Sequence, residues 1–330
     1  MLNPHLNLNQ KLFDQDIDQK PTRNGYGEGL VKLGESNPNV VVMTADLSDS
    51  TRCEKFAEKF PDRFIECGVA EQNMAAIAAG LGVSGKIPFI SSYATFSPGK
   101  NWETIRTTIV YNEANVKIAG HHAGIVTGPD GATHQATEDI AITRCWPNIQ
   151  VINPCDAYEA EKATIAAGNS IGPVYLRFTR DKTPVMTTSE TPFSVGKIQT
   201  FWVSENPQVL LLGTGHMRYY ALLAAKELEQ EKIDVLVANV ATIKPLDEAG
   251  LLDVIKQTQA IVTVEDHQVM GGLGGAIAEF TAKNMPVPVE FVGLQNTFAE
   301  SGNPKELIEK YGMGENAIKE AVKKVIARKK

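Results

Sequence analysis

Cysteine is scarce in this sequence and never closely paired. Only four cysteines occur among the 330 residues, and none forms a CxxC motif: Cys53, Cys67, Cys145 and Cys155. Small disulfide-stabilised domains and structural zinc sites both need closely spaced cysteines. We therefore expect reduced thiols, a cytoplasmic protein and no metal site in this chain.

Long apolar runs and an excess of positive charge are also missing. No run reaches the roughly 18 residues that a membrane-spanning helix needs. Residues 1–20 lack the apolar stretch and cleavage site of a secretory signal. The formal net charge of -7 argues against nucleic acid or an anionic membrane as the main partner. With 43% hydrophobic and 22% charged residues, a soluble globular fold is expected.

Short apolar runs alternate with amphipathic stretches over the first half of the chain. Such alternation predicts a largely parallel sheet with helices on both faces. The predicted strands are Val40–Thr44, Phe64–Cys67, Pro88–Ser92, Val116–Gly120, Val151–Asn153 and Val174–Phe178. The predicted helices are 72–81, 101–111 and 157–167.

A polar stretch, TTSETPFSVGK at residues 187–197, precedes a second alternation of the same kind. We therefore predict an α/β protein of two three-layer domains with mainly parallel sheets. The expected boundaries are a polar arm at 1–20, a first domain at 21–187, a linker at 188–197 and a second domain at 198–330. The second domain should contain strands 209–212, 235–240, 261–264 and 289–292, and helices 217–230, 248–256, 276–283 and 315–326.

Candidate chemical groups follow the predicted strands of the first domain, where open parallel sheets bind ligands. Glu71 begins a helix of small residues that we expect to be buried, so its carboxylate needs a specific partner. The alternative is a first-turn acid that only complements the helix dipole. Phe96, on the next loop, is either a core residue or a ring on which a planar heterocycle stacks.

Residues 120–135 contain three histidines, an aspartate and four glycines. His121 and His122 are neighbours on a strand and point to opposite faces, which favours a substrate loop over a metal site. Arg180 follows the predicted strand Val174–Phe178 and suits a bidentate grip on phosphate. Two glycine-rich loops, 213–215 and 271–275, match no phosphate-binding motif and are interpreted as turns and close packing.

Together these segments resemble the transketolase family over nearly all of the chain after residue 20. No single segment is specific, but their order and spacing are. The matching segments are Lys20-Pro-Thr-Arg23, 45–50, Gly68-Val-Ala-Glu71, Ala94-Thr-Phe96, His122 to Gln135, Arg180, 243–247 and 264–272.

The resemblance implies that the first domain binds the pyrimidine end of thiamine diphosphate. Glu71 matches the acid that hydrogen-bonds the pyrimidine N1′, and Phe96 matches the ring that stacks on the pyrimidine. Asp46 matches a residue near the thiazolium. Trp102 stands among positions where relatives add further aromatics, although Gly99 occupies another such position.

The resemblance also implies a sugar-phosphate substrate. Asp130 matches an acid that contacts a substrate hydroxyl, and His134 matches a histidine near the donor carbonyl; with Glu71 they are the expected catalytic residues. Four residues match the family's grip on the phosphate: Arg23, Ser50, His122 and Arg180.

The family's Gly-Asp-Gly motif, which binds the diphosphate through Mg²⁺, does not occur in this sequence. The resemblance therefore implies a separate N-terminal subunit that carries the Mg²⁺ and diphosphate site, in an α₂β₂ heterotetramer. The expected activity is ketol transfer between phosphorylated sugars, the transferase chemistry of the pentose phosphate pathway.

Other thiamine-diphosphate enzymes remain alternatives. The β subunit of a 2-oxoacid dehydrogenase usually shows Gly-Ala-Gln/His-His-Ser where this chain has Gly131-Ala-Thr-His-Gln135. Deoxyxylulose-phosphate synthase shares the Thr-His-Gln pattern but keeps all of its domains in one chain. A specialised sugar or sulfosugar transketolase and a non-catalytic relative complete the set.

Overall fold

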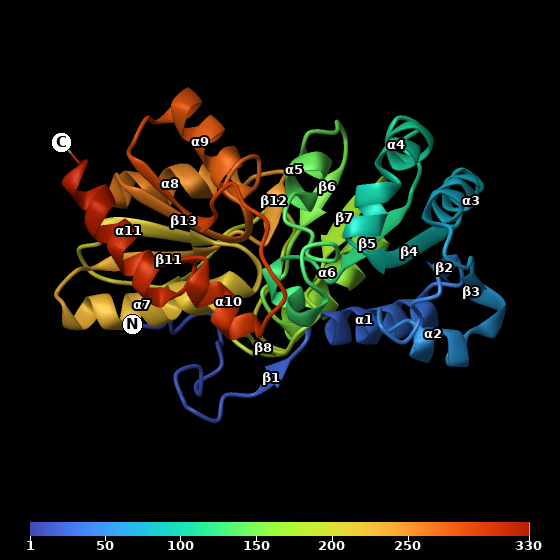
Figure 1. Ribbon diagram of the computed structural model, residues 1–330, viewed down its shortest axis with the longest axis horizontal. Coiled ribbons are helices and arrows are strands. Elements are labelled where there is room, and N and C mark those ends of the chain that lie inside the picture. The colour runs from blue at the N-terminus through green and yellow to red at the C-terminus, as the bar shows by residue number, and fades with distance from the viewer. Residues whose placement is uncertain (330) are drawn as a thin grey trace.

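The computed structural model describes residues 1–329, and it contains two α/β domains that lie side by side (Figure 1). A seven-stranded sheet forms the centre of the first domain and a five-stranded sheet forms the centre of the second. Both sheets are mainly parallel and flanked by helices, so the predicted fold class is confirmed.

The first sheet has the strand order β12-β6-β7-β5-β4-β2-β3. All neighbours are parallel except β12 and β6. Every residue of β2, β5 and β7 is buried, because both faces of the sheet are covered. The bounds are β2 (Val40–Thr44), β3 (Phe64–Glu66), β4 (Ile87–Tyr93), β5 (Lys117–His121), β6 (Gln150–Ile152), β7 (Val174–Arg177) and β12 (Thr242–Lys244).

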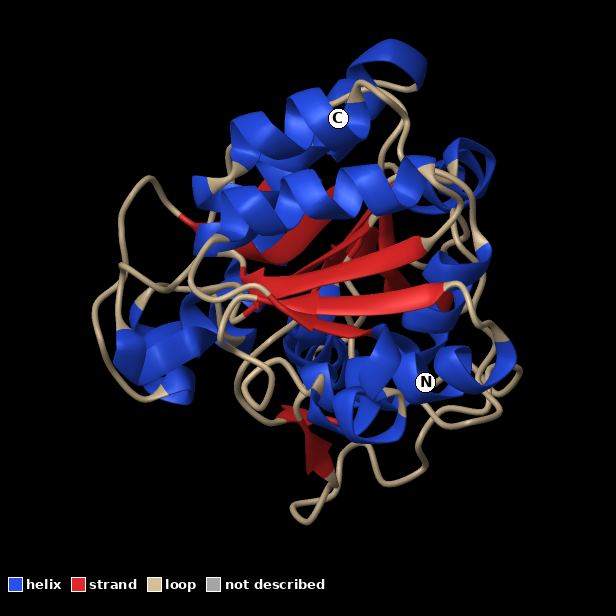
Figure 2. Cartoon of the chain, turned by 90° about the vertical axis from the view of Figure 1, so that its right-hand side faces the viewer, coloured by secondary structure: helices blue, strands red, loops and turns tan. Residues whose placement is uncertain are grey.

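Helices cover both faces of this sheet and give the first domain three layers (Figure 2). Leu30 and Ala163 belong to the cluster on one face, under α1, α2 and α6. Met74 and Ile109 belong to the cluster on the other face, under α3, η3 and α5. The helices are α1 (Thr22–Ser36), α2 (Glu54–Lys59), η1 (Pro61–Arg63), α3 (Glu71–Val83), η2 (Thr95–Lys100), α4 (Trp102–Thr104), η3 (Ile105–Val110), η4 (Ile125–Asp130), α5 (Asp139–Arg144) and α6 (Ala157–Asn169).

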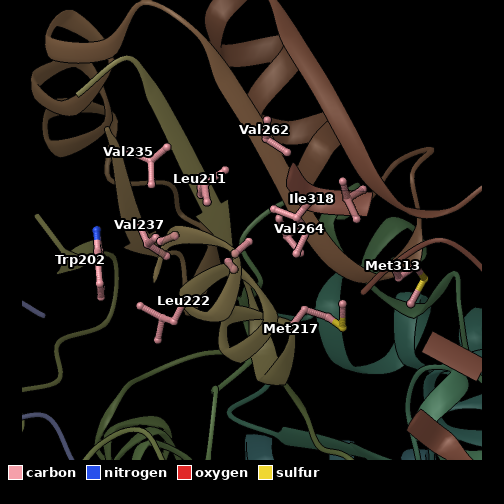
Figure 3. Close-up of a cluster of buried hydrophobic side chains, with 14 of the residues drawn as sticks. Trp202, Leu211, Met217, Leu222, Val235, Val237, Val262, Val264, Met313 and Ile318 are labelled. Atoms are coloured by element: carbon pink, nitrogen blue, oxygen red, sulfur yellow. The ribbon is translucent and has the colours of Figure 1, made fainter. Parts of the chain in front are cut away.

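The second sheet has the order β14-β13-β10-β11-β9, in which only β9 is antiparallel to its neighbour. Side chains of its strands gather with Leu222 of α7 and Ile318 of α11 in one buried cluster (Figure 3). A second cluster lies under α8 and α9. The elements are β9 (Gln199–Trp202), β10 (Val209–Gly213), η5 (Gly215–Met217), α7 (Arg218–Gln230), β11 (Val235–Asn239), α8 (Glu248–Thr258), β13 (Ile261–Gln268), α9 (Leu273–Asn284), β14 (Val289–Leu294), α10 (Pro304–Lys310) and α11 (Glu315–Ala327).

The N-terminal arm packs against this chain's own second domain. Figure 1 places the N-terminus beside α7, far along the chain from it. Leu8, Leu12 and Ile17 are buried in the same cluster as the second sheet. The arm then reaches the first domain, where β1 (Gln19–Lys20) pairs with β8 (Thr183–Pro184). From the sequence we expect only a polar arm in this segment.

The second domain also contributes one strand to the sheet of the first domain. β12 lies between two elements of the second domain in sequence, yet it joins the edge of the first sheet beside β6. Thr242 pairs with Ile152, and Lys244 pairs with Val151. This short strand had no counterpart among the predicted elements.

The predicted strands and helices are confirmed, with two informative differences. β13 continues to Gln268, past the predicted end at Val264, and three of its added residues, Glu265, Asp266 and His267, are polar but buried. The predicted helix 101–111 is an irregular one, because α4 passes into the wider turns of η3. Within residues 1–329, no helix has the length and apolar character needed to cross a membrane.

Candidate active site

Four loops converge at one edge of the first sheet. They follow β2, β3, β4 and β5, which are neighbouring parallel strands, so their carboxyl ends meet at the same edge. The register places Thr44 beside Glu66 and Tyr93 beside His121. The fold therefore brings together residues that are up to about a hundred positions apart in the sequence, as the strand pattern predicted.

Glu71 is the first residue of α3 and is 2% exposed. Its Oε2 lies 3.2 Å from the Nζ of Lys100, and its Oε1 accepts a 3.4 Å hydrogen bond from the hydroxyl of Ser92. Asn101 Nδ2 also donates to the backbone oxygen of Glu71 at 3.0 Å. A buried carboxylate needs such partners, so the position is built around the acid group. Lys100 was not among the predicted site residues, because a lysine on a loop carries no sequence signal of its own.

Aromatic rings line the edge beside Glu71. Tyr93 stacks on His122 with 3.8 Å between ring centroids, and it stacks on Phe96 at 5.9 Å. The edge of His134 approaches Phe96 at 5.4 Å. Phe96 is thus a partly exposed wall of the site, and Tyr93, which sequence reasoning missed, extends the same wall.

The predicted phosphate residues share one electropositive region. Arg23 donates from Nη1 to the backbone oxygen of Ser50 at 2.6 Å. Burial, followed by the charges of Arg52 and Arg180, lowers the pKa of Arg23. Burial, with the charges of Arg23 and Arg180, lowers the pKa of His122 to about 3. Because the charge of Arg180 contributes to the lowered pKa of both Arg23 and His122, these cationic groups lie close together. Such an arrangement favours an anionic ligand.

Two polar atoms in this region have no hydrogen-bond partner among residues 1–329. They are Arg23 Nε and His122 Nδ1, and both are buried. Buried polar groups are normally satisfied, so an unpaired donor in a positive region fits an anionic oxygen. Arg180, whose charge acts on both Arg23 and His122, has its Nε 3.6 Å from Asp130 Oδ2.

Two further predicted cofactor residues lie in different surroundings. Asp46 is exposed just after β2, and its backbone N–H donates to Glu66 Oε1 at 2.7 Å. Trp102 packs away from the ring wall: it stacks on Trp146, and its Nε1 donates to Ile142 O at 2.9 Å. These contacts give Trp102 a packing role and lend no support to its assignment to the cofactor.

Two other sequence features prove to be structural. His121 is enclosed by the rings of Tyr26 and Phe178, which leaves His122 alone to face the site. The glycine-rich loop 271–275 surrounds a carboxylate of the protein itself: Glu265 accepts the N–H groups of Leu273 and Gly274. In the part of the chain described here, no group of three or more His, Cys, Asp or Glu side chains is arranged to hold a metal ion.

Comparison with known families identifies both domains. Residues 18–186 match the pyrimidine-binding domain of transketolase, and residues 199–318 match the transketolase C-terminal domain. The chain belongs to the transketolase family. Its first domain therefore corresponds to the pyrimidine-binding domain of transketolase, and its second domain corresponds to the transketolase C-terminal domain.

Several relatives are similar over the whole chain. A putative transketolase C-terminal section from Methanocaldococcus jannaschii is 42% identical, over 91% of this chain and 94% of the relative. SqwH, a subunit of a 6-deoxy-6-sulfo-D-fructose transketolase from Clostridium sp. (strain MSTE9), is 35% identical, over 96% and 98%. A solved structure of a split gene transketolase, an inactive beta4 tetramer, has a TM-score of 0.87 and 42% identity, over 94% of this chain and 99% of that one.

Single-chain transketolases are about twice as long. Human transketolase is 35% identical to this chain, over 94% of this chain but only 50% of the human protein. The chain therefore spans about half the length of these relatives.

The residues of the site fit the pyrimidine end of thiamine diphosphate. Glu71 offers a buried carboxyl at the start of a helix, and Phe96 and Tyr93 offer ring faces at the same edge of the sheet. A planar heterocycle with ring nitrogens needs a surface for stacking and a hydrogen-bonding acid at its rim.

Proposed function

We propose that this chain is the C-terminal subunit of a thiamine-diphosphate-dependent transketolase, which transfers a two-carbon ketol unit between phosphorylated sugars together with a separate N-terminal subunit. When bound, thiamine diphosphate supplies the carbon that carries the two-carbon unit. The pyrimidine end would bind here, whereas the diphosphate and Mg²⁺ would bind to the partner subunit. An α₂β₂ heterotetramer is the expected assembly.

The buried position of Glu71 is the observation that carries this proposal. A carboxyl that is 2% exposed and held by Ser92 and Lys100 is poised to hydrogen-bond a ring nitrogen. Phe96 would present its ring to the pyrimidine. Asp130 and His134 would contact the hydroxyls and the carbonyl end of the sugar and hold it in place for the transfer.

The positive region supports a phosphorylated substrate. Arg23, His122 and Arg180 would bind the terminal phosphate, with the buried Arg23 Nε and His122 Nδ1 as donors that have no partner within the described chain. Ser50 adds a hydroxyl on the loop that Arg23 already contacts through the backbone. Charge-assisted contacts of this kind fix one end of the sugar and leave the other end to react.

The outer side of α3 supports a partner subunit. We define the outer face of α3 as Asn73, Ala76, Ile77, Gly80 and Val83, which are all exposed and carry no charge. The opposite side of the helix is equally apolar and is buried. A helix that is apolar all round is normally covered on every side. Because Glu71 begins this helix, a subunit that covers the outer face would stand next to the cofactor.

Reconstitution with a candidate N-terminal subunit tests the proposal. Ketol transfer from xylulose 5-phosphate to ribose 5-phosphate would be measured with thiamine diphosphate and Mg²⁺, for each subunit alone and for the mixture. Activity should appear only in the mixture, as the inactive tetramer of a related split chain suggests. Activity of this chain alone would contradict the need for a partner, and a stable but inactive complex would contradict the assigned reaction.

A sulfosugar transketolase is the second candidate. SqwH resembles this chain over the full length of both proteins. A sulfonate, like a phosphate, is an anion that arginines bind, so the positive region is compatible with either group. Comparing kcat/KM for 6-deoxy-6-sulfo-D-fructose and fructose 6-phosphate as donors in the same complex decides between them. The donor with the higher value identifies the anion for which the site is built.

A further inference from the structure

The substrate loop, residues 122–137, has an irregular backbone. It carries His122, Asp130 and His134, and it contains only the irregular turns of η4. Its glycines at 124, 128 and 131, and His122 itself, all have positive φ angles. Its internal backbone hydrogen bonds, such as those from Gly124 N–H to Ala136 O at 2.7 Å and from His134 N–H to Gly131 O at 3.0 Å, form no regular ladder. The shape of the loop therefore also depends on contacts with the rest of the molecule.

Asp266 of the second domain provides the central contact. It lies near the end of β13, and its side chain is 1% exposed. Its Oδ1 accepts the N–H of Ile125 at 2.9 Å, and its Oδ2 accepts the N–H of Val126 at 3.4 Å. A Cβ at Gly124 would lie only 2.0 Å from Oδ2, so the loop can approach the carboxylate only because a glycine stands there.

Asp266 is itself firmly held. His216 Nε2 lies 3.1 Å from its Oδ2, and Arg177 Nη2 donates to its backbone oxygen at 2.8 Å. Burial raises the pKa of Asp266, but the hydrogen bond and charge of His216 and the charge of Arg177 outweigh burial and lower it. The group is therefore a charged double acceptor, the strongest kind for two neighbouring N–H donors.

Other contacts between the domains hold the far side of the loop. Gln135 Nε2 donates to Gly128 O at 3.2 Å and to Glu300 O at 3.1 Å, which joins the loop to the segment before α10. The N–H of Gln268 donates to Thr137 O at 2.7 Å. The second domain thus contacts the loop near its start, in its middle and at its end.

We propose that Asp266 is a positioning residue for ketol transfer: from the second domain it fixes the substrate loop, so that Asp130, His134 and His122 face the substrate. The assignment of a reaction rests on the proposed function above, but the fixing of the loop does not. Asp266 touches no reacting atom. The second domain therefore acts on catalysis through the loop and not only through assembly.

Asp247 provides a matched control for Asp266. It is also a buried aspartate of the second domain, and it also accepts two backbone N–H groups, from Ile198 and Gly250. Its contacts do not involve the substrate loop. Replacing either aspartate removes two buried acceptors, so both changes should lower the unfolding temperature, whereas only the change at Asp266 should alter the loop.

The experiment compares D266N, D266A, D247N and D247A in the complex with the N-terminal subunit. Hydrogen exchange at residues 122–137 is measured first, because it needs no activity; it should accelerate in D266A, less in D266N, and not in the Asp247 variants. kcat/KM per folded complex should fall by about tenfold or more in D266A and change by less than about twofold in D247A. D266N, which keeps one acceptor oxygen, should fall in between.

Unchanged loop exchange in D266N and D266A would overturn the proposal, whatever the enzyme's reaction. So would an equal loss of kcat/KM in the Asp247 variants, since that would reflect general destabilisation. If D266A does not fold, hydrogen exchange and kcat/KM of D266N alone test the proposal. If loop exchange accelerates in the Asp266 variants but the wild-type complex performs no ketol transfer, the proposed reaction is refuted and the fixing of the loop is established.

Discussion

Single residues at the sheet edge combine burial with charge. Glu71 is buried but held by Lys100 and Ser92, and His122 is buried beside cationic groups. Each is costly to bury, and no packing need explains them. Such residues are typical of sites at which a ligand supplies the missing partners.

Replacing Glu71 should abolish ketol transfer and leave the fold intact. Alanine removes the acid that would hydrogen-bond the pyrimidine, and it also leaves Lys100 without its carboxylate. We expect kcat of the reconstituted complex to fall by about a thousandfold or more. Subunit association, measured by analytical ultracentrifugation, should be unchanged. Near-normal turnover of Glu71→Ala would exclude the assigned role.

His122 should make the stability of the chain depend on pH. Its pKa is about 3 in the folded chain, below its ordinary value of 6.5, so from pH 6.5 downward the unfolded chain takes up a proton that the folded chain does not. Stability should therefore fall with decreasing pH, by about 1.4 kcal/mol per unit from this residue.

Comparison with His122→Gln isolates this effect, because all other groups titrate in both proteins. Urea unfolding at pH 7 and pH 5 should show that wild type loses about 2 kcal/mol more than the variant between the two values. Equal losses would mean that His122 takes up a proton in the folded chain as readily as in the unfolded one.

At the scale of elements, α3 differs from its neighbours. Its inner side packs in the core of the first domain, whereas its outer face is exposed and uncharged. The sequence predicted a buried helix from the small residues on all sides. The prediction holds for one side only, because no other element among residues 1–329 covers the other side.

A charge on the outer face of α3 should weaken association with the N-terminal subunit. Ala76→Glu places a carboxylate on an exposed position, so the fold should be unaffected, but an apolar interface would have to bury that charge. We expect the Kd, measured by calorimetry, to rise by about tenfold or more. Gln257→Glu, on an exposed position of α8, is the matched control and should leave the Kd unchanged. Equal affinities would place the partner elsewhere.

At the scale of the whole molecule, three segments join the two domains. They are the N-terminal arm, the strand β12 and the substrate loop. Leu12 is fully buried in the second domain, although it precedes the first domain in sequence. β12 completes the edge of the first sheet although it comes from the second domain. Connections in both directions predict that the domains unfold together.

Leu12→Ala should destabilise the whole chain by about 2–5 kcal/mol, the usual range for a buried leucine. Because the domains are joined, circular dichroism and, in a Trp202→Phe background that removes the second-domain tryptophan, the fluorescence of Trp102 and Trp146 in the first domain should report one shared transition in urea. Leu6→Ala, at a partly buried position of the arm, should cost less. A first-domain transition that Leu12→Ala leaves unmoved would show that the domains unfold separately.

Local sequence determined much of this protein. Strands such as β2 and β10 are continuous apolar runs, and their alternation with helices suffices for an α/β fold because each element must bury its apolar side. The order of the segments around Glu71, Phe96 and His134 likewise indicates the family, and the parallel sheet brings these residues to one edge.

Only the tertiary structure decided the contacts between distant segments. Asp266 and Ile125 are separated by 141 residues, and β12 is too short to show any periodicity. The predicted strand ended at residue 264 because the hydrogen-bonded burial of Glu265 and Asp266 cannot be inferred from residue type. The packing of Trp102 could not be foreseen for the same reason, since its partner Trp146 lies on another segment. Hydrophobic pattern is local, whereas the pairing of polar groups depends on which segments the fold places together.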